Sequence, residues 1–356
     1  MKKGRVYRQL IGLAAFAMIA SGSLLMTELP AFAKSAPHHQ VLSHRTAPVV
    51  NMVSVANFGA LGNGIANDTQ SIQNAINAVA QQGGGVVYIP NGVYMVDATK
   101  SIQLKSNVSL QLSSNAVLQA IPNSDGSYAI LEGSGVQNVS ISGGTIQGER
   151  NQHLGTSGEW GMGVKFYGVQ NVTISNLTVD NCWGDGIYIG EGQNQNNEVT
   201  LNNVVVNNNR RNGITIVNGQ NITISNCTAE NSNGTAPADG IDIEPNHPTD
   251  LLQNINITDL TTSNNAGNGL EICTQQLNNS GQNISVNVNH QQDTGSKIGF
   301  RASCYSLTGN INVLNSSWSQ NSKSNIFVIN NDPNPGYNQL PLHINVNIPG
   351  YKVNLS

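Results

Sequence analysis

The chain has 356 residues, of which only 10% are charged, and its formal net charge is −4 at neutral pH. A protein surface that binds nucleic acid must be basic to meet the phosphates, so this charge argues against nucleic acid as a partner. In a chain so poor in charge, charged side chains that gather at one place are informative about function.

The first 33 residues predict a secretory signal peptide. Basic residues precede an apolar run from Leu10 to Met26, and a small-residue cleavage site follows at Ala31 to Ala33. The apolar run is too short, and wrongly flanked, for a membrane anchor. We therefore expect a secreted, extracellular protein that has no membrane contact once the signal is removed. Residues 34–51 read as an extended leader.

A capping helix is predicted at about residues 68–82. Asp68 or Thr69 can cap its N-terminus. The apolar residues that follow are spaced to form one stripe, namely Ile72, Ala75, Ile76 and Val79. Gly83 to Gly85 end the helix and turn the chain into the first strand. Such a helix would cover the open first coil of a repeat protein.

A glycine-centred phrase then repeats along the chain. Its glycines are Gly186, Gly213, Gly240 and Gly269, spaced 27, 27 and 29 residues apart, with weaker copies at Gly163 and Gly299. A fixed period of this length indicates a solenoid, and the alternation of apolar and polar residues after each glycine indicates strands. We predict an all-β fold, a parallel β-helix of about ten coils that forms a single domain over residues 52–356.

A second repeated phrase contains a turn residue in each copy. These residues are Asn176, Asn203, Asn226, Asp259 and Asn315. Asparagine tolerates left-handed turn geometry, and stacked side-chain amides hydrogen-bond to one another. We therefore predict a structural asparagine stack at one turn of the coil.

The second residue after each repeat glycine should point outward, because its neighbours on both sides are apolar. Read coil by coil, this position holds Lys165, Tyr188, Thr215, Asp242, Glu271 and Arg301. Like charges on neighbouring strands repel and raise one partner's pKa, so the adjacent acids indicate a functional site. A polar surface with a structural Glu271–Arg301 salt bridge is the alternative.

Further polar residues extend this cluster. Glu244 lies two residues beyond Asp242 on the same face, and His247 follows it. Asp239 and Asp185 each precede a repeat glycine. We expect the first of these to add a carboxylate to the cluster and the second to lie at the same edge.

Aromatic and basic residues gather before the glycines. Trp160 and Trp183 each lie three residues before one, and they predict either a two-ring platform for sugar rings or packing under a loop. Arg211, beside Arg210, occupies the next coil and could hold a uronate or sulfate.

Cys273 and Cys304 have nearly equal offsets on adjacent coils, so we predict that they lie close enough to form a disulfide.

The opening of the domain resembles that of a known superfamily. The phrase runs from Val55-Ala56-Asn57-Phe58-Gly59 through Asn67-Asp68-Thr69 to Gly83-Gly84-Gly85-Val86-Val87-Tyr88. It is similar to the start of the pectate-lyase-like β-helix superfamily, which includes polygalacturonases, rhamnogalacturonases and mannuronan C5-epimerases. The resemblance covers residues 52 to about 330 and implies a right-handed parallel β-helix. It says little about chemistry, because one fold hosts many activities.

Two catalytic patterns of that superfamily are matched in part. Gly184-Asp185-Gly186-Ile187 and Gly299-Phe300-Arg301 resemble motifs of polygalacturonases, but the chain lacks their Asp-Asp pair and Gly-His-Gly. Asp239-Gly240-Ile241-Asp242-Ile243-Glu244 resembles an epimerase motif, with Glu244 in place of its histidine and without its tyrosine. The chain therefore departs from the standard enzyme of both groups.

Three functions remain open from the sequence. The first is a secreted glycoside hydrolase, in which Asp242, Glu244 and Glu271 share the general acid and the base or nucleophile roles on a polysaccharide. The second is a lyase or C5-epimerase on a uronate polymer, with Arg301, Lys165 or a bound Ca²⁺ as the cation and His247 or Tyr188 as the base. The third is a non-catalytic carbohydrate-binding solenoid. The hydrolase would need no cofactor and no metal, and we expect a monomer.

Overall fold

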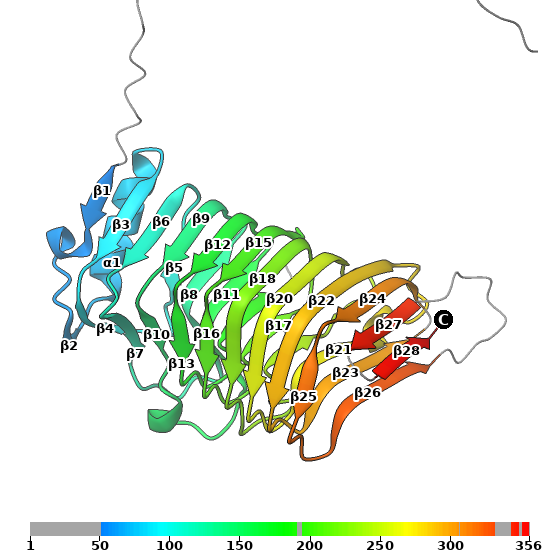
Figure 1. The fold of residues 1–356 in the computed structure, drawn as a ribbon. Coiled ribbons are helices and arrows are strands. Elements are labelled where there is room, and N and C mark those ends of the chain that lie inside the picture. Colours follow the sequence, from blue (N-terminus) through cyan, green and yellow to red (C-terminus); the bar gives the residue numbers. More distant parts are fainter. Residues whose placement is uncertain (1–50, 191–193, 306, 332–342, 349–350, 356) are drawn as a thin grey trace, which may run out of the picture. The chain divides into compact units, whose positions relative to one another are not determined.

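The computed structural model describes residues 51–190, 194–305, 307–331, 343–348 and 351–355. The predicted signal peptide over residues 1–33, and all of the leader over 34–51 except its last residue, lie outside the described residues. The rest confirms the predicted fold, which is a right-handed parallel β-helix (Figure 1).

One wall of the helix carries the site. In the part of the chain that the structure describes, this wall is a nine-stranded parallel sheet. Its strands are β5 (Ile102–Gln103), β8 (Ser127–Ser134), β11 (Trp160–Tyr167), β14 (Ile187–Gly190), β17 (Ile214–Ile216), β19 (Ile241–Ile243), β21 (Asn268–Cys273), β23 (Ile298–Tyr305) and β26 (Ser324–Asn331). Each strand pairs with the corresponding strand of the next coil, so neighbouring coils lie about 4.8 Å apart.

The other walls are built from strands that complete each coil. They are β1 (Met52–Ser54), β2 (Asn63–Asn67), β3 (Gly85–Ile89), β4 (Gly92–Val96), β6 (Val108–Leu112), β7 (Ala116–Ala120), β9 (Gln137–Ser142), β10 (Thr145–Gln147), β12 (Gln170–Ser175), β13 (Thr178–Asp180), β15 (Asn196–Asn202), β16 (Val205–Asn207), β18 (Gly219–Glu230), β20 (Leu252–Ser263), β22 (Asn283–Thr294), β24 (Thr308–Leu314), β25 (Ser317–Ser319), β27 (His343–Ile348) and β28 (Tyr351–Leu355). The last two pair antiparallel, whereas the other described pairs are parallel. Inward-facing Ile, Val and Leu side chains form one continuous buried core.

The capping helix α1 spans Thr69–Gln81, as predicted, and its predicted apolar stripe is buried. Asp68 stands at its N-cap position, but its side chain does not cap the helix. Its two carboxylate oxygens instead accept hydrogen bonds from the backbone N–H groups of Leu61 and Gly62. Asp68 therefore fixes the loop that precedes β2 against the start of the helix.

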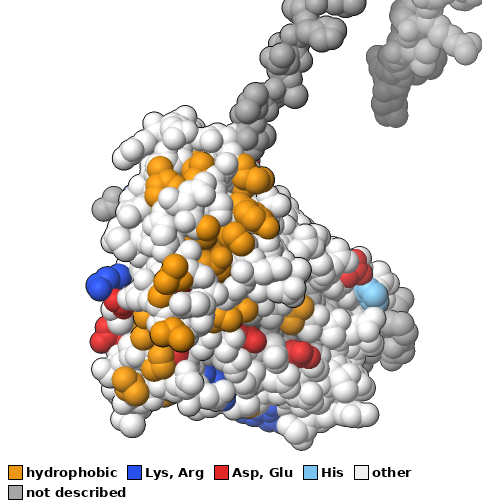
Figure 2. Space-filling view, turned by 90° about the vertical axis from the view of Figure 1, so that its left-hand side faces the viewer, with side chains coloured by type: hydrophobic (Ala, Val, Ile, Leu, Met, Phe, Trp, Pro, Cys, Tyr) orange, Lys and Arg blue, Asp and Glu red, His pale blue; other side chains and the backbone are white. Residues whose placement is uncertain are grey.

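The end of the solenoid that carries α1 and β2 has scattered apolar side chains and few charged ones (Figure 2). Three large hydrophobic residues are exposed at this end: Met52 in β1, Leu61 in the loop before β2, and Ile65 in β2. The helix thus covers the core of the first coil without making the outer surface of this end uniformly polar.

The predicted left-handed turns are confirmed, because the five predicted residues all have φ values between 50° and 53°. The predicted amide hydrogen bond is present between two of them, where Asn203 Nδ2 donates to Asn176 Oδ1 over 2.7 Å, one coil away. A similar contact at another turn joins Asn171 to Asn138 over 2.8 Å. Such bonds link the turns of neighbouring coils.

Candidate active site

The predicted ladder is in register on the site wall. Its pairs are Lys165 with Tyr188, Tyr188 with Thr215, Thr215 with Asp242, Asp242 with Glu271, and Glu271 with Arg301. Two further residues extend it, because Glu132 pairs with Lys165 and Arg301 pairs with Phe327. The ladder places Asp242 next to Glu271, about 4.8 Å apart along the solenoid.

The acids of the ladder face out of the coil but are shielded from solvent. Ile241 and Ile243 point into the core on either side of Asp242, which therefore projects outward. Asp242 is nevertheless only 1% exposed and Glu271 only 4% exposed. Neighbouring side chains and turns cover them. A carboxylate shielded in this way loses its hydration, and this favours its neutral form.

A second ladder lies one residue before each repeat glycine and alternates acid with amide. Its members are Asp185, Asn212, Asp239 and Asn268. The backbone N–H of each later member donates to a side-chain oxygen of the member before it: Asn212 to Asp185 and Asp239 to Asn212, both over 3.0 Å, and Asn268 to Asp239. The alternation avoids direct stacking of two carboxylates at this position.

Asn212 is the centre of a hydrogen-bonded chain. Its Oδ1 accepts from the Asp239 backbone, so its Nδ2 must face the other way. That Nδ2 donates to Thr215 Oγ1 over 3.1 Å and to Asp242 Oδ2 over 3.0 Å. Thr215 in turn donates to Asp185 Oδ2 over 2.9 Å. The chain leads from Asp185 to Asp242 across three coils and fixes the orientation of the Asp242 carboxyl.

Asp242 and Glu244 form a carboxyl pair. Burial raises the pKa of Asp242 well above its ordinary value, and the nearby charge of Glu244 raises it further. Burial also raises the pKa of the half-buried Glu244, while the charge of Arg211 and a hydrogen bond from Asp242 act in the opposite direction. Burial therefore favours the neutral form of both carboxyls, and Glu244 is the more accessible of the two.

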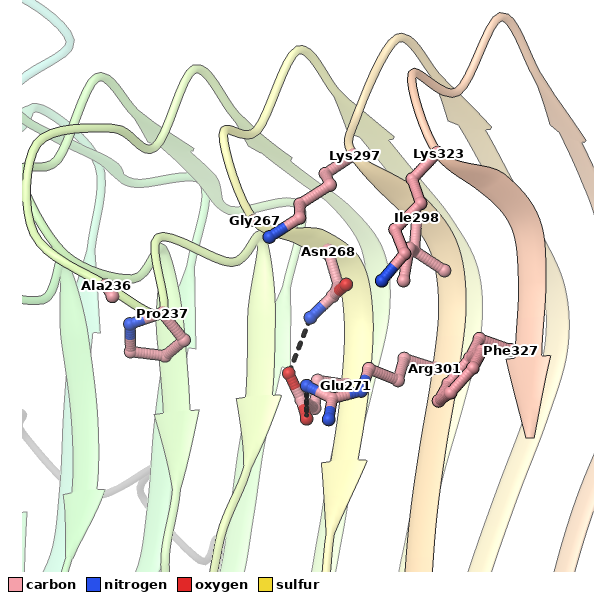
Figure 3. A pocket seen from close by; sticks show the side chains of 10 residues that line it. All are labelled: Ala236, Pro237, Gly267, Asn268, Glu271, Lys297, Ile298, Arg301, Lys323 and Phe327. Atoms are coloured by element: carbon pink, nitrogen blue, oxygen red, sulfur yellow. Dashed lines mark hydrogen bonds and ion pairs between the residues drawn. The ribbon is translucent and has the colours of Figure 1, made fainter. Parts of the chain in front are cut away.

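Asp239 and Glu271 form a second pair, which joins the coil of Asp242 to the next coil. Burial raises the pKa of Asp239 well above its ordinary value, with further contributions from the charges of Asp242 and Glu271. Asp239 Oδ2 is buried and has no hydrogen-bond partner. Glu271 accepts hydrogen bonds from Asn268 Nδ2 over 2.5 Å and from Arg301 Nη1 over 2.6 Å. Figure 3 shows the last two contacts.

Asp185 and Arg211, predicted to bind substrate, contact each other. Arg211 Nη1 lies 3.1 Å from Asp185 Oδ2, and Arg211 Nε lies 3.6 Å from the Glu159 carboxylate. Asp185 is fully buried, so it supports Arg211, Asn212 and Thr215 and presents no oxygen to a ligand. Arg211 in turn places a positive charge beside Asp242 and Glu244.

The remaining predicted substrate residues are more dispersed. Lys165 lies three strands from Asp242, about 14 Å along the ladder, and its Nζ stands 4.7 Å from the centre of the Tyr167 ring. Tyr188 packs edge-on against the same ring. His247 is exposed in the loop after β19, where its backbone N–H donates to Asp250 Oδ2 over 2.8 Å. Their binding roles remain predictions.

The two-ring sugar platform is corrected by the structure. His153 stacks on Trp183 with ring centres 3.8 Å apart, and the Arg210 guanidinium lies 3.8 Å from the Trp183 ring centre. Two groups that close to one ring must occupy opposite faces, so neither face of Trp183 is open to a sugar. Trp160, by contrast, is 49% exposed. The packing alternative therefore holds for Trp183.

The predicted Cys273–Cys304 disulfide is wrong. Both cysteines are free thiols. Cys273 pairs in register with Ser303, one residue before Cys304. Because side chains alternate between the faces of a strand, Cys273 points outward and Cys304 points into the core.

A pocket of about 410 Å³ adjoins the second carboxyl pair. Its lining includes Glu271 and Asn268, together with three cations from two neighbouring coils, Lys297 and Arg301 on one and Lys323 on the next (Figure 3). The two lysines were not predicted from the sequence. Asn212 and Asn268 were not predicted either, although their shared offset from the repeat glycines was a signal that could have revealed them.

Two further properties concern the described residues as a group. They contain no helix long and apolar enough to cross a membrane. They also contain no group of three or more His, Cys, Asp or Glu side chains arranged to hold a metal ion.

Comparison with known proteins identifies the family. A family model described as rhamnogalacturonase A/epimerase, pectate lyase-like, matches residues 52–238, which is more than half of the chain. The chain belongs to this family. A second model, described as a right handed beta helix region, matches residues 162–338.

Individual relatives share part of this fold. The uncharacterized protein YclG of Bacillus subtilis is 28% identical over 68% of this chain and 46% of its own length. The iota-carrageenase of Alteromonas macleodii is 35% identical over 37% of this chain and 27% of its own length. The chain thus spans less than half the length of these relatives. A Yersinia enterocolitica exopolygalacturonase structure has a TM-score of 0.57 at 16% identity, covering 84% of this chain and 65% of that one. This last likeness shows the fold.

Proposed function

We propose that this protein is a polysaccharide-active enzyme, and specifically a glycoside hydrolase whose reaction centre is the Asp242–Glu244 pair with Glu271 beside it. The observation that carries the proposal is the buried Asp242, whose pKa is raised well above its ordinary value, beside the more accessible Glu244. Glycoside hydrolysis requires one protonated carboxyl and one ionised carboxylate. A carboxyl whose pKa is raised by burial and by a neighbouring negative charge is suited to hold the proton while another carboxylate is ionised.

Each residue then has a distinct role. Asp242 holds the proton that Glu244 relays to the leaving glycosidic oxygen, because Glu244 is the member of the pair that solvent reaches. Glu271, held by Asn268 of its own strand and by Arg301 of the next strand, acts on the sugar as the base or nucleophile. Asn212 and Arg211 keep the pair in place. Proton transfer by positioned groups of this kind contributes a factor of about 10²–10⁴ to the rate.

The family supports the substrate class. One relative by sequence is a carrageenase and one structural neighbour is a polygalacturonase, so related chains act on polysaccharides. The basic n-region and apolar run at the N-terminus support secretion, which would bring the enzyme to extracellular polymers.

Digestion of a panel of polysaccharides, followed by mass analysis of the products, tests the proposal. Hydrolysis adds one water per cut and releases reducing ends. Products that lack the added water and absorb at about 235 nm would instead identify a lyase. In that case, removing Ca²⁺ with a chelator would show whether the lyase requires the ion. Unchanged mass with altered uronate configuration would identify an epimerase. Binding without any product would identify a carbohydrate-binding solenoid.

A further inference from the structure

The pocket beside Glu271 is built by three successive coils. Asn268 and Glu271 come from β21, Ile298 and Arg301 from β23, and Phe327 from β26. Pro237, in the turn before β19, borders it on the side of the acid pair. The pocket is therefore contiguous with the proposed reaction centre, because Glu271 belongs to both.

The charges that line this pocket do not cancel. Arg301 is neutralised by Glu271, which its Nη1 contacts over 2.6 Å. Lys297 and Lys323 stand in equivalent turns of neighbouring coils, joined by a backbone hydrogen bond of 2.9 Å. Among the described residues neither lysine has a carboxylate within 4.0 Å, the limit for an ion pair. Both are exposed and point toward the pocket (Figure 3). The pocket thus carries an excess of two positive charges.

An aromatic ring completes the pocket. Phe327 follows Arg301 on the ladder. The Arg301 guanidinium lies 5.9 Å from its ring centre and the Lys323 ammonium 5.7 Å from it. An apolar ring face next to cations suits a ligand that has both C–H groups and a negative charge. A volume of about 410 Å³ lies within the range for small-ligand pockets.

We infer that this pocket is a subsite for one anionic sugar residue of the polymer, with Lys297 and Lys323 holding its carboxylate or sulfate ester and Phe327 packing against its ring. The inference rests on the proposed function and names its substrate class as an acidic polysaccharide. Arg301 is two strands from Asp242, about 10 Å along the ladder. The charged sugar therefore lies beside the sugar whose bond is cleaved.

The test measures binding by calorimetry to the full chain carrying Asp242→Asn, which should bind substrate without cleaving it. The ligands are an oligogalacturonate, a carrageenan oligosaccharide and a neutral galactan oligosaccharide of equal length. We expect one of the two anionic ligands to bind at least about tenfold more tightly than the neutral one, because hydrogen bonds between a lysine and an anionic group are stronger than those between neutral groups. Tighter binding of the oligogalacturonate would identify a carboxylate as the group that the pocket holds, and tighter binding of the carrageenan oligosaccharide would identify a sulfate ester.

Lys297→Met with Lys323→Met should remove that preference and leave neutral binding unchanged. Lys100→Met with Lys105→Met is the matched control, because it removes two positive charges near α1, far along the solenoid. Equal binding of all three ligands, or equal loss in both double variants, would overturn the subsite. If the anionic ligand binds through the two lysines but the wild-type protein cleaves no polymer, the subsite is supported and the hydrolase is rejected. If the wild-type protein cleaves a neutral polymer and shows no preference for anionic ligands, the hydrolase is supported and the subsite is rejected.

Discussion

Asn212 donates a hydrogen bond from Nδ2 to Asp242 Oδ2 over 3.0 Å, and its own orientation is fixed by the backbone N–H of Asp239. A donor at this oxygen leaves the other oxygen of Asp242 to carry the proton toward Glu244. Asn212 thus fixes the orientation of the carboxyl, while the proton that leaves with the product must be replaced from water.

Asp242→Asn and Glu244→Gln should each lower turnover by a factor of about 10²–10⁴. Asparagine mimics the protonated Asp242, because its oxygen can accept from Asn212 and its amide can donate to Glu244. The fold should therefore be retained, with a thermal midpoint close to that of the wild type. Turnover on the digestion substrate and thermal unfolding are the two measurements. Glu230→Gln, a carboxylate on a different wall of the solenoid, should change neither. Wild-type turnover in both site variants would exclude this centre.

Glu271→Gln should move the alkaline limb of the pH–rate profile to lower pH. The negative charge of Glu271 is one of the causes that raise the pKa of Asp242, after burial and the charge of Glu244. Removing it lowers that pKa, so the acid loses its proton at a lower pH. The residual activity of the variant, followed from acid to alkaline pH, measures the shift. An alkaline limb at the wild-type position would show that Glu271 and Asp242 do not interact.

Asp185→Asn should destabilise the protein by about 3 kcal/mol or more, because it leaves the shielded Arg211 without its closest partner. Glu159→Gln removes the longer and more exposed contact of the same arginine, and should cost less than about 1 kcal/mol. Denaturant unfolding compares the two. Adding Arg211→Met to Asp185→Asn should recover part of the loss. Equal, small effects of both single variants would contradict the supporting role of Asp185.

Trp183→Ala and Trp160→Ala should separate packing from substrate contact. The Trp183 ring lies between His153 and Arg210, so its loss should cost about 3 kcal/mol of stability. Trp160 is half exposed, and its loss should stay within about 0.5 kcal/mol. If Trp160 contacts the polymer, its variant should raise KM at unchanged stability. A stable Trp183→Ala protein with a raised KM would restore the platform hypothesis for that ring.

The strand register of the site was predictable because the repeat glycines mark one position of every coil. Once Gly240 and Gly269 are aligned, Asp242 and Glu271 must be neighbours, as the structure confirms. The alignment cannot report what covers the outer face, so it did not reveal that both acids are buried. Asn212 and Asn268 share one position in the same alignment. They were not predicted as site residues because the chain contains many asparagines, so two more at a repeat position did not stand out from the structural ones.

Three other features could not be predicted by aligning the repeats. Cys273 and Cys304 differ by a single residue in offset, and one residue reverses the face to which a side chain points. Lys323 lies in a coil that has no repeat glycine, so the alignment ended at Gly299 and never paired this lysine with Lys297. The stacking partner of Trp183 on one face, His153, comes from the loop between β10 and β11, which belongs to no repeated phrase.

The ladder also sets how this kind of protein can change its specificity. Because Glu271 belongs to both the reaction centre and the lysine pocket, a coil inserted on either side of β21 would separate it from one of them. The strands β19, β21, β23 and β26 must therefore be inherited as one block, in which each step along the ladder is about 4.8 Å. Specificity can then change through substitutions at the pocket residues, while coils can be gained or lost outside this block without changing the spacing between the charged sugar and the cleaved bond.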